Sequence, residues 1–248
     1  MGSYQFEKRL VLDYYNALEQ AAPDAVPGVL ERFLGPDYAW RSSYPFRTLE
    51  HVDEVARRFW SPLKRALTHM RRRMDVFIAG NNELDGTVWV MSMGHFMGLF
   101  DHEILGIRPT RKMASLRYAE FSCVQGGKIT QTGLFLDWIG LMHQAGVYPL
   151  PPMTGQYFVY PGPRTHDGLL FADAPAEEGV KTLKLVNQMV DDLDKLNQGG
   201  SMEPPSVADL SRSWAGDMSW YGPCGIGATY TIARYIGQHT GPFRGGLT

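Results

Sequence analysis

This sequence has little cysteine and no long apolar run, and we expect no leader segment. Only Cys123 and Cys224 occur in 248 residues, which gives no disulfide framework and favours a reducing compartment. The most apolar stretch, residues 88–100, is interrupted by polar residues and is shorter than the roughly 18–20 residues of a membrane-spanning helix. Residues 1–10 lack the apolar centre of a signal peptide. We therefore expect a cytoplasmic protein that does not enter a membrane.

The sequence also lacks an excess of positive charge. Its net charge is -2 and its pI about 6.4, whereas nucleic-acid-binding domains usually have a pI above about 9. The apolar fraction of 44% is ordinary for a globular protein. The length of 248 residues predicts one large domain, or one domain and part of another. Because of its charge, we expect that the protein does not bind nucleic acid.

Hydrophobic periodicity divides residues 1–152 into helices followed by strands. Helical spacing predicts helices at 6–18, 28–34 and 52–60, the last of them kinked or stopped by Pro62. From residue 74 the period becomes two, which predicts strands at 74–79, 88–96, 112–124 and 128–138. Gly126-Gly127 suits a tight hairpin turn, and a short helix follows at 139–145. The pattern predicts an α+β domain with helices on one face of a curved antiparallel sheet.

The rest of the chain predicts a linker and then a partial repeat. Residues 153–179 are rich in Pro and Gly and predict a linker, and helices return in residues 180–248. At an offset of 180, Trp40 and Pro62 coincide with Trp220 and Pro242, which predicts a duplication. This second copy lacks the strands of 74–138. We therefore expect either a fragment of a longer polypeptide, or a last segment that packs on the first domain or on a partner.

Short motifs follow one another in a familiar order from residue 94 onward. They are Gly94-His95, Gly106-Ile107-Arg108-Pro109-Thr110, Gly127-Lys128-Ile129, Asp137 and Leu141-Met142-His143-Gln144-Ala145-Gly146. Over roughly residues 5–150 this order resembles the SnoaL-like polyketide cyclase family of the nuclear transport factor 2-like superfamily. Departures from the family pattern occur at Arg108, Arg111, Gly126 and Gln131. With the repeat, the chain looks like a tandem member whose second copy is incomplete.

The resemblance implies a cone-shaped, curved antiparallel sheet with helices packed on its concave side, an apolar pocket inside, and a homodimer through the outer face of the sheet. It also implies an activity without a cofactor or metal on a small apolar carbonyl compound. Members of the family catalyse aldol cyclisation, isomerisation or dehydration, and others only bind ligands, so the site residues have to decide the function.

Asp137 is the first candidate catalytic residue. Counting back in steps of two places Phe135, Gly133 and Gln131 on its face, which we expect to be the inner one. In an apolar pocket its carboxylate would be desolvated and therefore more basic, as proton abstraction beside a carbonyl requires. In the family, the matching aspartate is the general acid/base of an aldol condensation. The alternative is an Asp that caps the helix at 139–145.

His95 is the second catalytic candidate, as a proton donor to an enolate oxygen, or else a hydrogen-bonded core histidine. Aromatic and sulfur side chains are the candidate substrate contacts, and His102 could contact substrate at the mouth of the pocket. Neighbouring Asp101 and Glu103 lack the spacing of a metal site. The candidate substrate-binding residues are Trp40, Tyr44, Trp89, Met91, Met93, Tyr14, Tyr15, His102 and Phe135.

Two function classes remain open from the sequence. The first is a cofactor-free enzyme of the polyketide cyclase or isomerase type that uses Asp137 to move protons. The second is a non-catalytic small-molecule-binding or assembly module of the same fold, favoured by an amide partner near the carboxylate or by a filled and sealed interior. Epoxide hydrolysis ranks last, because we find no second carboxylate on the inner strand faces.

Overall fold

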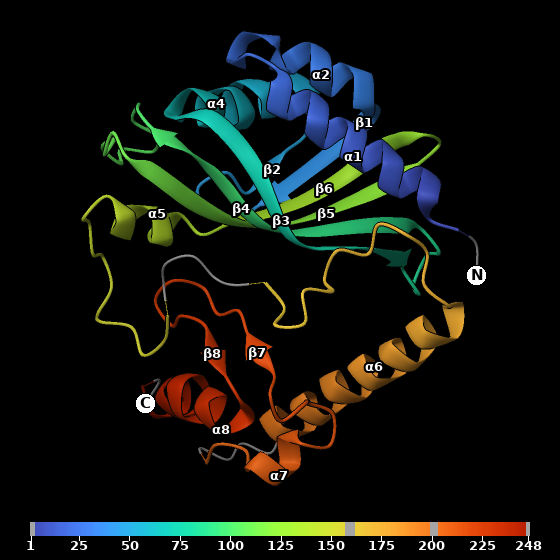
Figure 1. Cartoon of the computed structure of the whole chain (residues 1–248), viewed down its shortest axis with the longest axis vertical. Helices are drawn as coiled ribbons and strands as arrows, with labels where there is room; N and C mark the ends of the chain where they lie inside the picture. The colour runs from blue at the N-terminus through green and yellow to red at the C-terminus, as the bar shows by residue number, and fades with distance from the viewer. Residues whose placement is uncertain (1–2, 157–161, 199–202, 247–248) are drawn as a thin grey trace. The chain divides into compact units, whose positions relative to one another are not determined.

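The computed structural model describes residues 3–156, 162–198 and 203–246. The described residues form two compact units, one of residues 3–149 with 162–173 and one of residues 150–156 with 174–246. The first is an α+β unit built on a curved, unclosed six-stranded sheet (Figure 1). This confirms the fold class expected from the sequence.

The sheet of the first unit has the strand order β2-β1-β6-β5-β4-β3. Neighbouring strands are antiparallel, except that β1 and β6 run parallel. Strands β3 to β6 are successive in the chain and pair in that order, as an antiparallel meander does. The strands are β1 (Leu34–Ser42), β2 (Thr48–Leu49), β3 (Leu67–Asn81), β4 (Val88–Phe100), β5 (Met113–Gln125) and β6 (Lys128–Leu136).

Helices α1, α2 and α4 lie over one face of this sheet (Figure 1). That face is buried and apolar, so we call it the inner face. Residues such as Val90, Phe96 and Leu116 alternate along the strands with more exposed ones on the outer face. The helical segments are α1 (Gln5–Gln20), η1 (Pro23–Ala25), α2 (Val26–Phe33), α3 (Val52–Val55), η2 (Ala56–Trp60), α4 (Ser61–Ala66) and α5 (Trp138–Gln144).

Of the two outcomes predicted for Pro62, a kink or a stop, the stop does not occur. The π-helical turn η2 leads directly into α4, and Pro62 lies in the first turn of α4. Proline is tolerated in a first helical turn, because its missing N–H would have no helical partner there.

Strand β1 is not predicted by the sequence pattern, since Gly35 and Pro36 indicate only the end of a helix. The segment nevertheless forms a strand beside β6, with Trp40 opposite Thr132. Trp40 therefore comes from the sheet and not from the helical layer. The hairpin turn at Gly126-Gly127 is confirmed, with φ of 56° and 75°.

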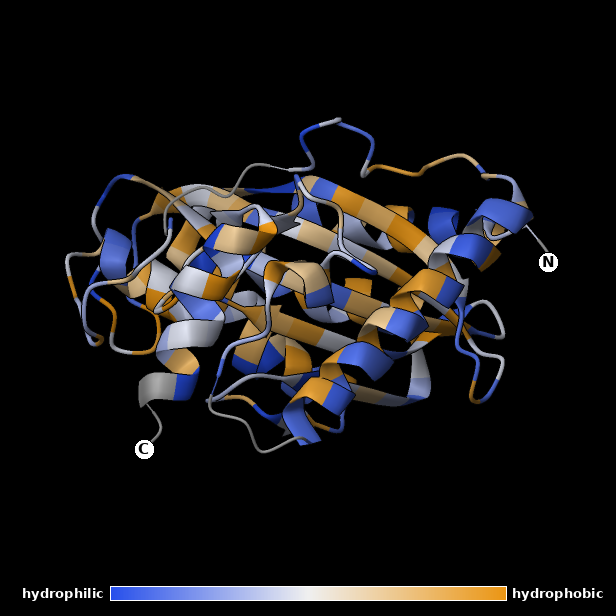
Figure 2. Ribbon diagram, turned by 90° about the horizontal axis from the view of Figure 1, so that it is seen from below, coloured by the Kyte–Doolittle hydropathy of each residue, from blue (hydrophilic) through white to orange (hydrophobic). Residues whose placement is uncertain are grey.

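The second unit is mainly helical and has a small core of its own around Leu210, Ile232 and Tyr235. The ribbon of α6 alternates between hydrophobic and hydrophilic residues (Figure 2). Ser206 caps α7, because its side chain accepts a hydrogen bond from the Asp209 N–H. The elements are α6 (Ala176–Gln198), α7 (Val207–Leu210), β7 (Ser219–Trp220), β8 (Thr229–Tyr230), α8 (Ile232–Tyr235), η3 (Ile236–Thr240) and α9 (Gly241–Gly246).

The elements of the second unit follow those of the first at an offset of 180. Segments α8, η3 and α9 correspond residue for residue to α3, η2 and α4, including the π-helical turn. The strand pair Trp220–Thr229 corresponds to the pair Trp40–Leu49. A duplication would produce this agreement, and we propose that the second unit arose by one. Counterparts of β3 to β6 do not occur in the part of this unit that the structure describes.

Candidate functional site

A buried ion pair lies at the centre of the inner face. Glu120 of β5 and Arg72 of β3 both point to this face, and Arg72 Nη1 donates to Glu120 Oε2 at 2.7 Å. The Glu120 side chain is 0% exposed and that of Arg72 is 7% exposed. Removing two charges from water is costly, so their burial requires close pairing and good packing around them.

Aromatic rings surround the Arg72 guanidinium. Its Cζ lies 3.5 Å from the ring centre of Tyr15, 4.6 Å from that of Tyr118 and 4.7 Å from that of Phe96. The rings of Phe96 and Tyr118 stack at 4.5 Å. A cation over ring faces is attracted by their quadrupoles, and this attraction is stronger away from water. Burial is the largest single effect on the pKa of Arg72 and lowers it, but the Glu120 carboxylate together with Tyr118 and Tyr15 outweighs burial, so the pKa is raised overall.

Four tyrosines extend this cluster. Burial raises the pKa of Tyr14 and of Tyr15 well above its ordinary value, and the negative charge of Glu120 raises both further. Burial also raises the pKa of Tyr38 and of Tyr118. All four hydroxyls stay protonated at neutral pH, and those of Tyr15 and Tyr38 are the two without a hydrogen-bond partner.

Several polar atoms on this face are buried without a hydrogen-bond partner. The second carboxylate oxygen of Glu120, Oε1, is one of them. The others nearby are the hydroxyls of Tyr15, Tyr38, Ser122 and Thr132 and the indole N–H of Trp40. Ser122 is the neighbour of Tyr15, and Thr132 is the neighbour of Tyr38, but neither pair of hydroxyls has ordinary hydrogen-bond geometry. Buried polar groups are nearly always paired in folded proteins, so this concentration requires an explanation.

Asp137 does not lie on the inner face, so that part of the sequence prediction is wrong. Phe135 is 50% exposed, whereas Leu134 and Leu136 are buried on the inner side of β6. Asp137 is the N-cap of α5 and accepts a hydrogen bond from Gly140 N at 2.9 Å. The helix-capping alternative therefore describes its position. Whether Asp137 also takes part in catalysis stays a prediction.

His95 also lies on the outer side, although it is only 2% exposed. Its Nδ1 is 3.4 Å from Asp75 Oδ2, and Asp75 Oδ1 pairs with Arg73 Nη2 at 3.0 Å. His95 is opposite Arg117 across the strands, and the Asp137 N–H donates to the Arg117 carbonyl. The two predicted catalytic residues thus share the outer face, with Arg117 between them, away from the inner cluster.

The predicted substrate contacts are divided between the two faces. Tyr14, Tyr15 and Trp40 are buried at the inner face, and their contact with a substrate stays a prediction. The predictions that place Tyr44, Trp89, Met91, Met93 and Phe135 in an inner pocket are wrong. Tyr44 is 76% exposed, because it lies in the turn after β1. The other four lie on the outer face, because side chains alternate along a strand. His102 lies in an exposed loop, as expected, and its contact with a substrate stays a prediction.

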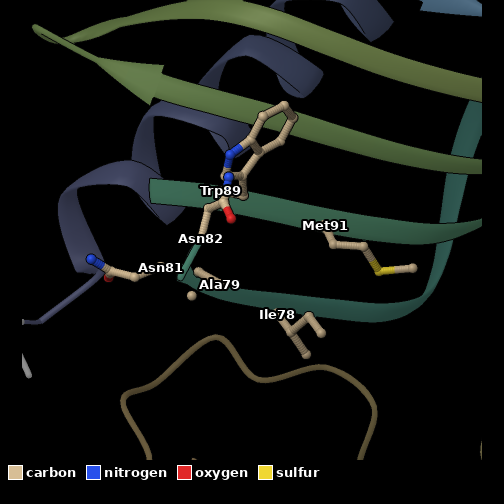
Figure 3. Close-up of a pocket in the computed structure, with 7 residues that line it drawn as sticks. Ile78, Ala79, Asn81, Asn82, Trp89 and Met91 are labelled. Carbon is tan, nitrogen blue, oxygen red and sulfur yellow. The ribbon is translucent and has the colours of Figure 1, made fainter. Parts of the chain in front are cut away.

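Two surface grooves lie outside the inner cluster. Figure 3 shows the smaller, of about 370 Å³, where Ile78 of β3 meets Trp89 and Met91 of β4. The larger, of about 580 Å³, has His69 and His102 in its wall. Among residues 3–156, 162–198 and 203–246, no group of three or more His, Cys, Asp or Glu side chains is arranged to hold a metal. Within the same ranges, no helix is both long and apolar enough to cross a membrane.

Sequence reasoning missed Glu120 and Arg72. A signal was present, because Leu116, Tyr118 and Glu120 share the parity of a buried strand face. The same count that was applied to Asp137 selects Glu120 in β5. Arg72 was hidden within the run Arg71-Arg72-Arg73, which suggests a solvated surface until the strand alternation turns its middle member inward.

No protein-family model and no curated protein matches this sequence. Solved structures do match about 60% of the chain. A protein from Jannaschia sp. CCS1 named as a SnoaL-like polyketide cyclase is 17% identical, with 60% of this chain and 95% of that chain covered and a TM-score of 0.43. A nuclear transport factor 2-like protein from Burkholderia thailandensis is 21% identical, with 59% and 98% covered and a TM-score of 0.41. A protein from Streptomyces antibioticus named as a polyketide cyclase is 15% identical, with 56% and 97% covered and a TM-score of 0.44. These names are those of the family that the sequence resembles.

Proposed function

We propose that the inner face binds a small, mainly apolar molecule that carries carbonyl or other hydrogen-bond-accepting oxygens. The observation behind this is the group of unpartnered polar atoms around Glu120. Each would cost about 1–3 kcal/mol if it stayed unsatisfied. Hydroxyl and indole groups that can donate outnumber the carboxylate oxygen that accepts, so a ligand rich in acceptor oxygens matches them. The surrounding aromatic rings suit a planar molecule.

We further propose that this site catalyses proton transfer beside a carbonyl, as aldol cyclisation, isomerisation and dehydration require. Glu120 is the base in this proposal, because Oε2 is held by Arg72 while Oε1 has no partner. Oε1 takes a proton from the carbon next to the carbonyl, and the electron pair of that C–H bond moves onto the carbonyl oxygen. Tyrosine and serine hydroxyls are the donors that would stabilise the resulting enolate. No cofactor enters this step.

Binding is tested by titrating the protein with a hydroxyanthraquinone, which is planar and rich in carbonyl oxygens. We expect quenching of tryptophan fluorescence, since Trp40 lies on the inner face. Tyr38→Phe removes one unpartnered donor and should weaken binding about threefold to tenfold. Tyr44→Phe is the matched control, because Tyr44 is exposed and far from the cluster in the sheet, and it should bind as the parent does. Equal affinities in the two variants would contradict the inner site.

Catalysis is tested by exchange of the acidic α-protons of a tetralone in D₂O, followed by NMR. Glu120→Gln should slow the catalysed exchange about a hundredfold or more, as loss of a general base does. Asp137→Asn keeps a side-chain oxygen for the helix cap and should leave the exchange rate unchanged. Loss of exchange in Asp137→Asn alone would favour the base that the sequence suggests. Binding without any catalysed exchange would favour the non-catalytic alternative.

A homodimer through the outer face of the sheet stays an expectation. In its favour, Phe121 and Phe135 are 37% and 50% exposed there and contact each other at 6.5 Å between ring centres. Light scattering after gel filtration would give twice the chain mass of 27.9 kDa. Phe135→Glu should then give the single-chain mass, and a monomeric parent would remove the dimer.

A further inference from the structure

Residues 162–173, which we name the edge strap, cover the free edge of the sheet. Strand β3 is the last strand of the sheet, and the edge strap runs parallel to it where Leu169 faces Phe77 (Figure 1). Phe77 N donates to the Gly168 carbonyl at 2.8 Å, and Leu170 N donates to the Phe77 carbonyl at 2.9 Å. A β-carbon at Gly168 would lie 2.5 Å from the Asp75 carbonyl oxygen, so glycine permits this close approach.

The edge strap is also tied to the start of α1. Lys8 is only 5% exposed, and its Nζ donates to the Ala172 carbonyl at 3.0 Å. Gln5 donates to the Phe171 carbonyl and to Asp173, at 3.1 and 2.9 Å. The strap therefore bridges from the edge of the sheet to the helix that packs over β3 and β4.

One row of side chains leads from the edge strap to the ion pair. The ring of Phe171 packs on that of Phe77 at 5.5 Å. Phe77 pairs across the strands with Ser92, and Ser92 pairs with Glu120, all on the inner face. Ser92 is also hydrogen-bonded to the Tyr118 hydroxyl at 2.8 Å. Phe77 is thus the only side chain in this row between the strap and the polar residues of the proposed site.

The edge strap is held to the sheet by only a short hydrogen-bonded stretch, and beyond it by side chains at the start of α1. It adds two backbone hydrogen bonds to β3, and Leu169, Leu170 and Phe171 are 38–43% exposed. Segments with sparse burial and short hydrogen-bonded stretches open locally at lower free energy than the core. The β3–β4 ladder beneath it is long and fully paired at Phe77, so the strap can leave without loss of the sheet.

We propose that the edge strap is a gate through which a small apolar carbonyl compound enters the inner face between α1 and β3. This inference rests on the proposed binding function. In the closed state, the Phe171 ring covers Phe77, and the hydrogen bond from the Lys8 ammonium to the Ala172 carbonyl keeps the strap against α1. In the open state, the side of Phe77 and the row toward Glu120 become accessible. A gate that closes over both the empty and the filled site controls the rates of entry and exit and leaves the affinity unchanged.

The test is stopped-flow fluorescence with the hydroxyanthraquinone on the full chain. Phe171→Ala removes the ring contact with Phe77, and Lys8→Met removes the hydrogen bond to the Ala172 carbonyl. Both the association and the dissociation rate constants should then rise about tenfold, with Kd unchanged within a factor of two. Leu170→Ala is the matched control, because Leu170 lies on the same strap and is 42% exposed, as against 43% for Phe171. Its rates should equal those of the parent.

Hydrogen exchange of the Phe77 and Leu170 amides follows strap opening without a ligand. Both should exchange faster in Phe171→Ala than in the parent, while amides at the centre of β5 keep their protection. Binding with unchanged rates, or strap amides as protected as those of β5, would overturn the gate alone. Absence of binding in the parent and in every variant would overturn the proposed function and the gate with it.

Discussion

The buried pair of Arg72 and Glu120 gives the sharpest stability prediction. Arg72→Met leaves the Glu120 carboxylate, which is 0% exposed, without its cation. Removal of one partner from a buried ion pair typically costs about 3–5 kcal/mol, because an uncompensated charge stays buried. Glu120→Leu should cost a similar amount by leaving the Arg72 guanidinium unpaired. These are large fractions of the about 5–15 kcal/mol by which a domain is stable.

The double variant Arg72→Met/Glu120→Leu separates this desolvation effect from general damage to packing. Both charges are then absent and the replacements are apolar, so the total cost should fall to about 0–2 kcal/mol. The two single costs would sum to about 6–10 kcal/mol, which gives a coupling free energy of several kcal/mol. Urea unfolding followed by circular dichroism measures each value by linear extrapolation.

The neighbouring pair of Arg71 and Glu19 provides a matched control. Arg71 Nη1 lies 3.0 Å from Glu19 Oε1, but the Arg71 side chain is 67% exposed and that of Glu19 is 28% exposed. Solvent-exposed pairs contribute about 0–1 kcal/mol, so Arg71→Met should cost less than 1 kcal/mol. The reasoning is refuted if Arg72→Met costs no more than Arg71→Met, or if the double variant costs as much as the two single variants together.

Three further predictions follow from the structure. Asp137→Ala should lower the free energy of unfolding by about 1 kcal/mol through loss of the α5 cap, and Asp137→Asn by much less; equal losses in urea unfolding would exclude the cap. Gly94→Ala should destabilise strongly, because a β-carbon there would lie 1.9 Å from the Arg73 carbonyl oxygen; a melting temperature unchanged in calorimetry would contradict this. Burial raises the pKa of Tyr15 and Tyr38, so the unfolded chain loses those protons first. The free energy of unfolding should therefore fall as pH rises above about 10, by up to about 1.4 kcal/mol per pH unit for each tyrosine; a free energy of unfolding that is flat up to pH 12 would contradict this.

The sequence predicts much of the fold because its periodicity is strong in the long strands. Residues 88–100 and 113–125 alternate over many residues, and the glycines at 126 and 127 leave little choice of turn. Strand β1 was not predictable in the same way. Glycine and proline follow its first residue, and its place beside β6 depends on pairing between residues about 90 positions apart in the chain.

The candidate site was less predictable, because alternation defines two faces and does not say which one is inside. Because Asp137 was assigned to the wrong face, Phe135, two residues before it, was assigned to that face as well. His95 was assigned to the inner side for the same reason. The inner face of β6 is identified only when Leu134 and Leu136 pack under the helices. The pairing of Arg72 with Glu120 depends on the register of β3, β4 and β5, which no local pattern contains.

A crystal structure of the protein with the hydroxyanthraquinone at high resolution is the most direct test of the inner site. We predict continuous density for the ring system beside Tyr15 and Tyr118, with a ligand oxygen at hydrogen-bond distance from the hydroxyl of Tyr38 or Ser122. Glu120 Oε1 should face the ligand or a water molecule bound with it. An inner face without density, in which Tyr15 pairs with Ser122 and Tyr38 pairs with Thr132, would contradict the account.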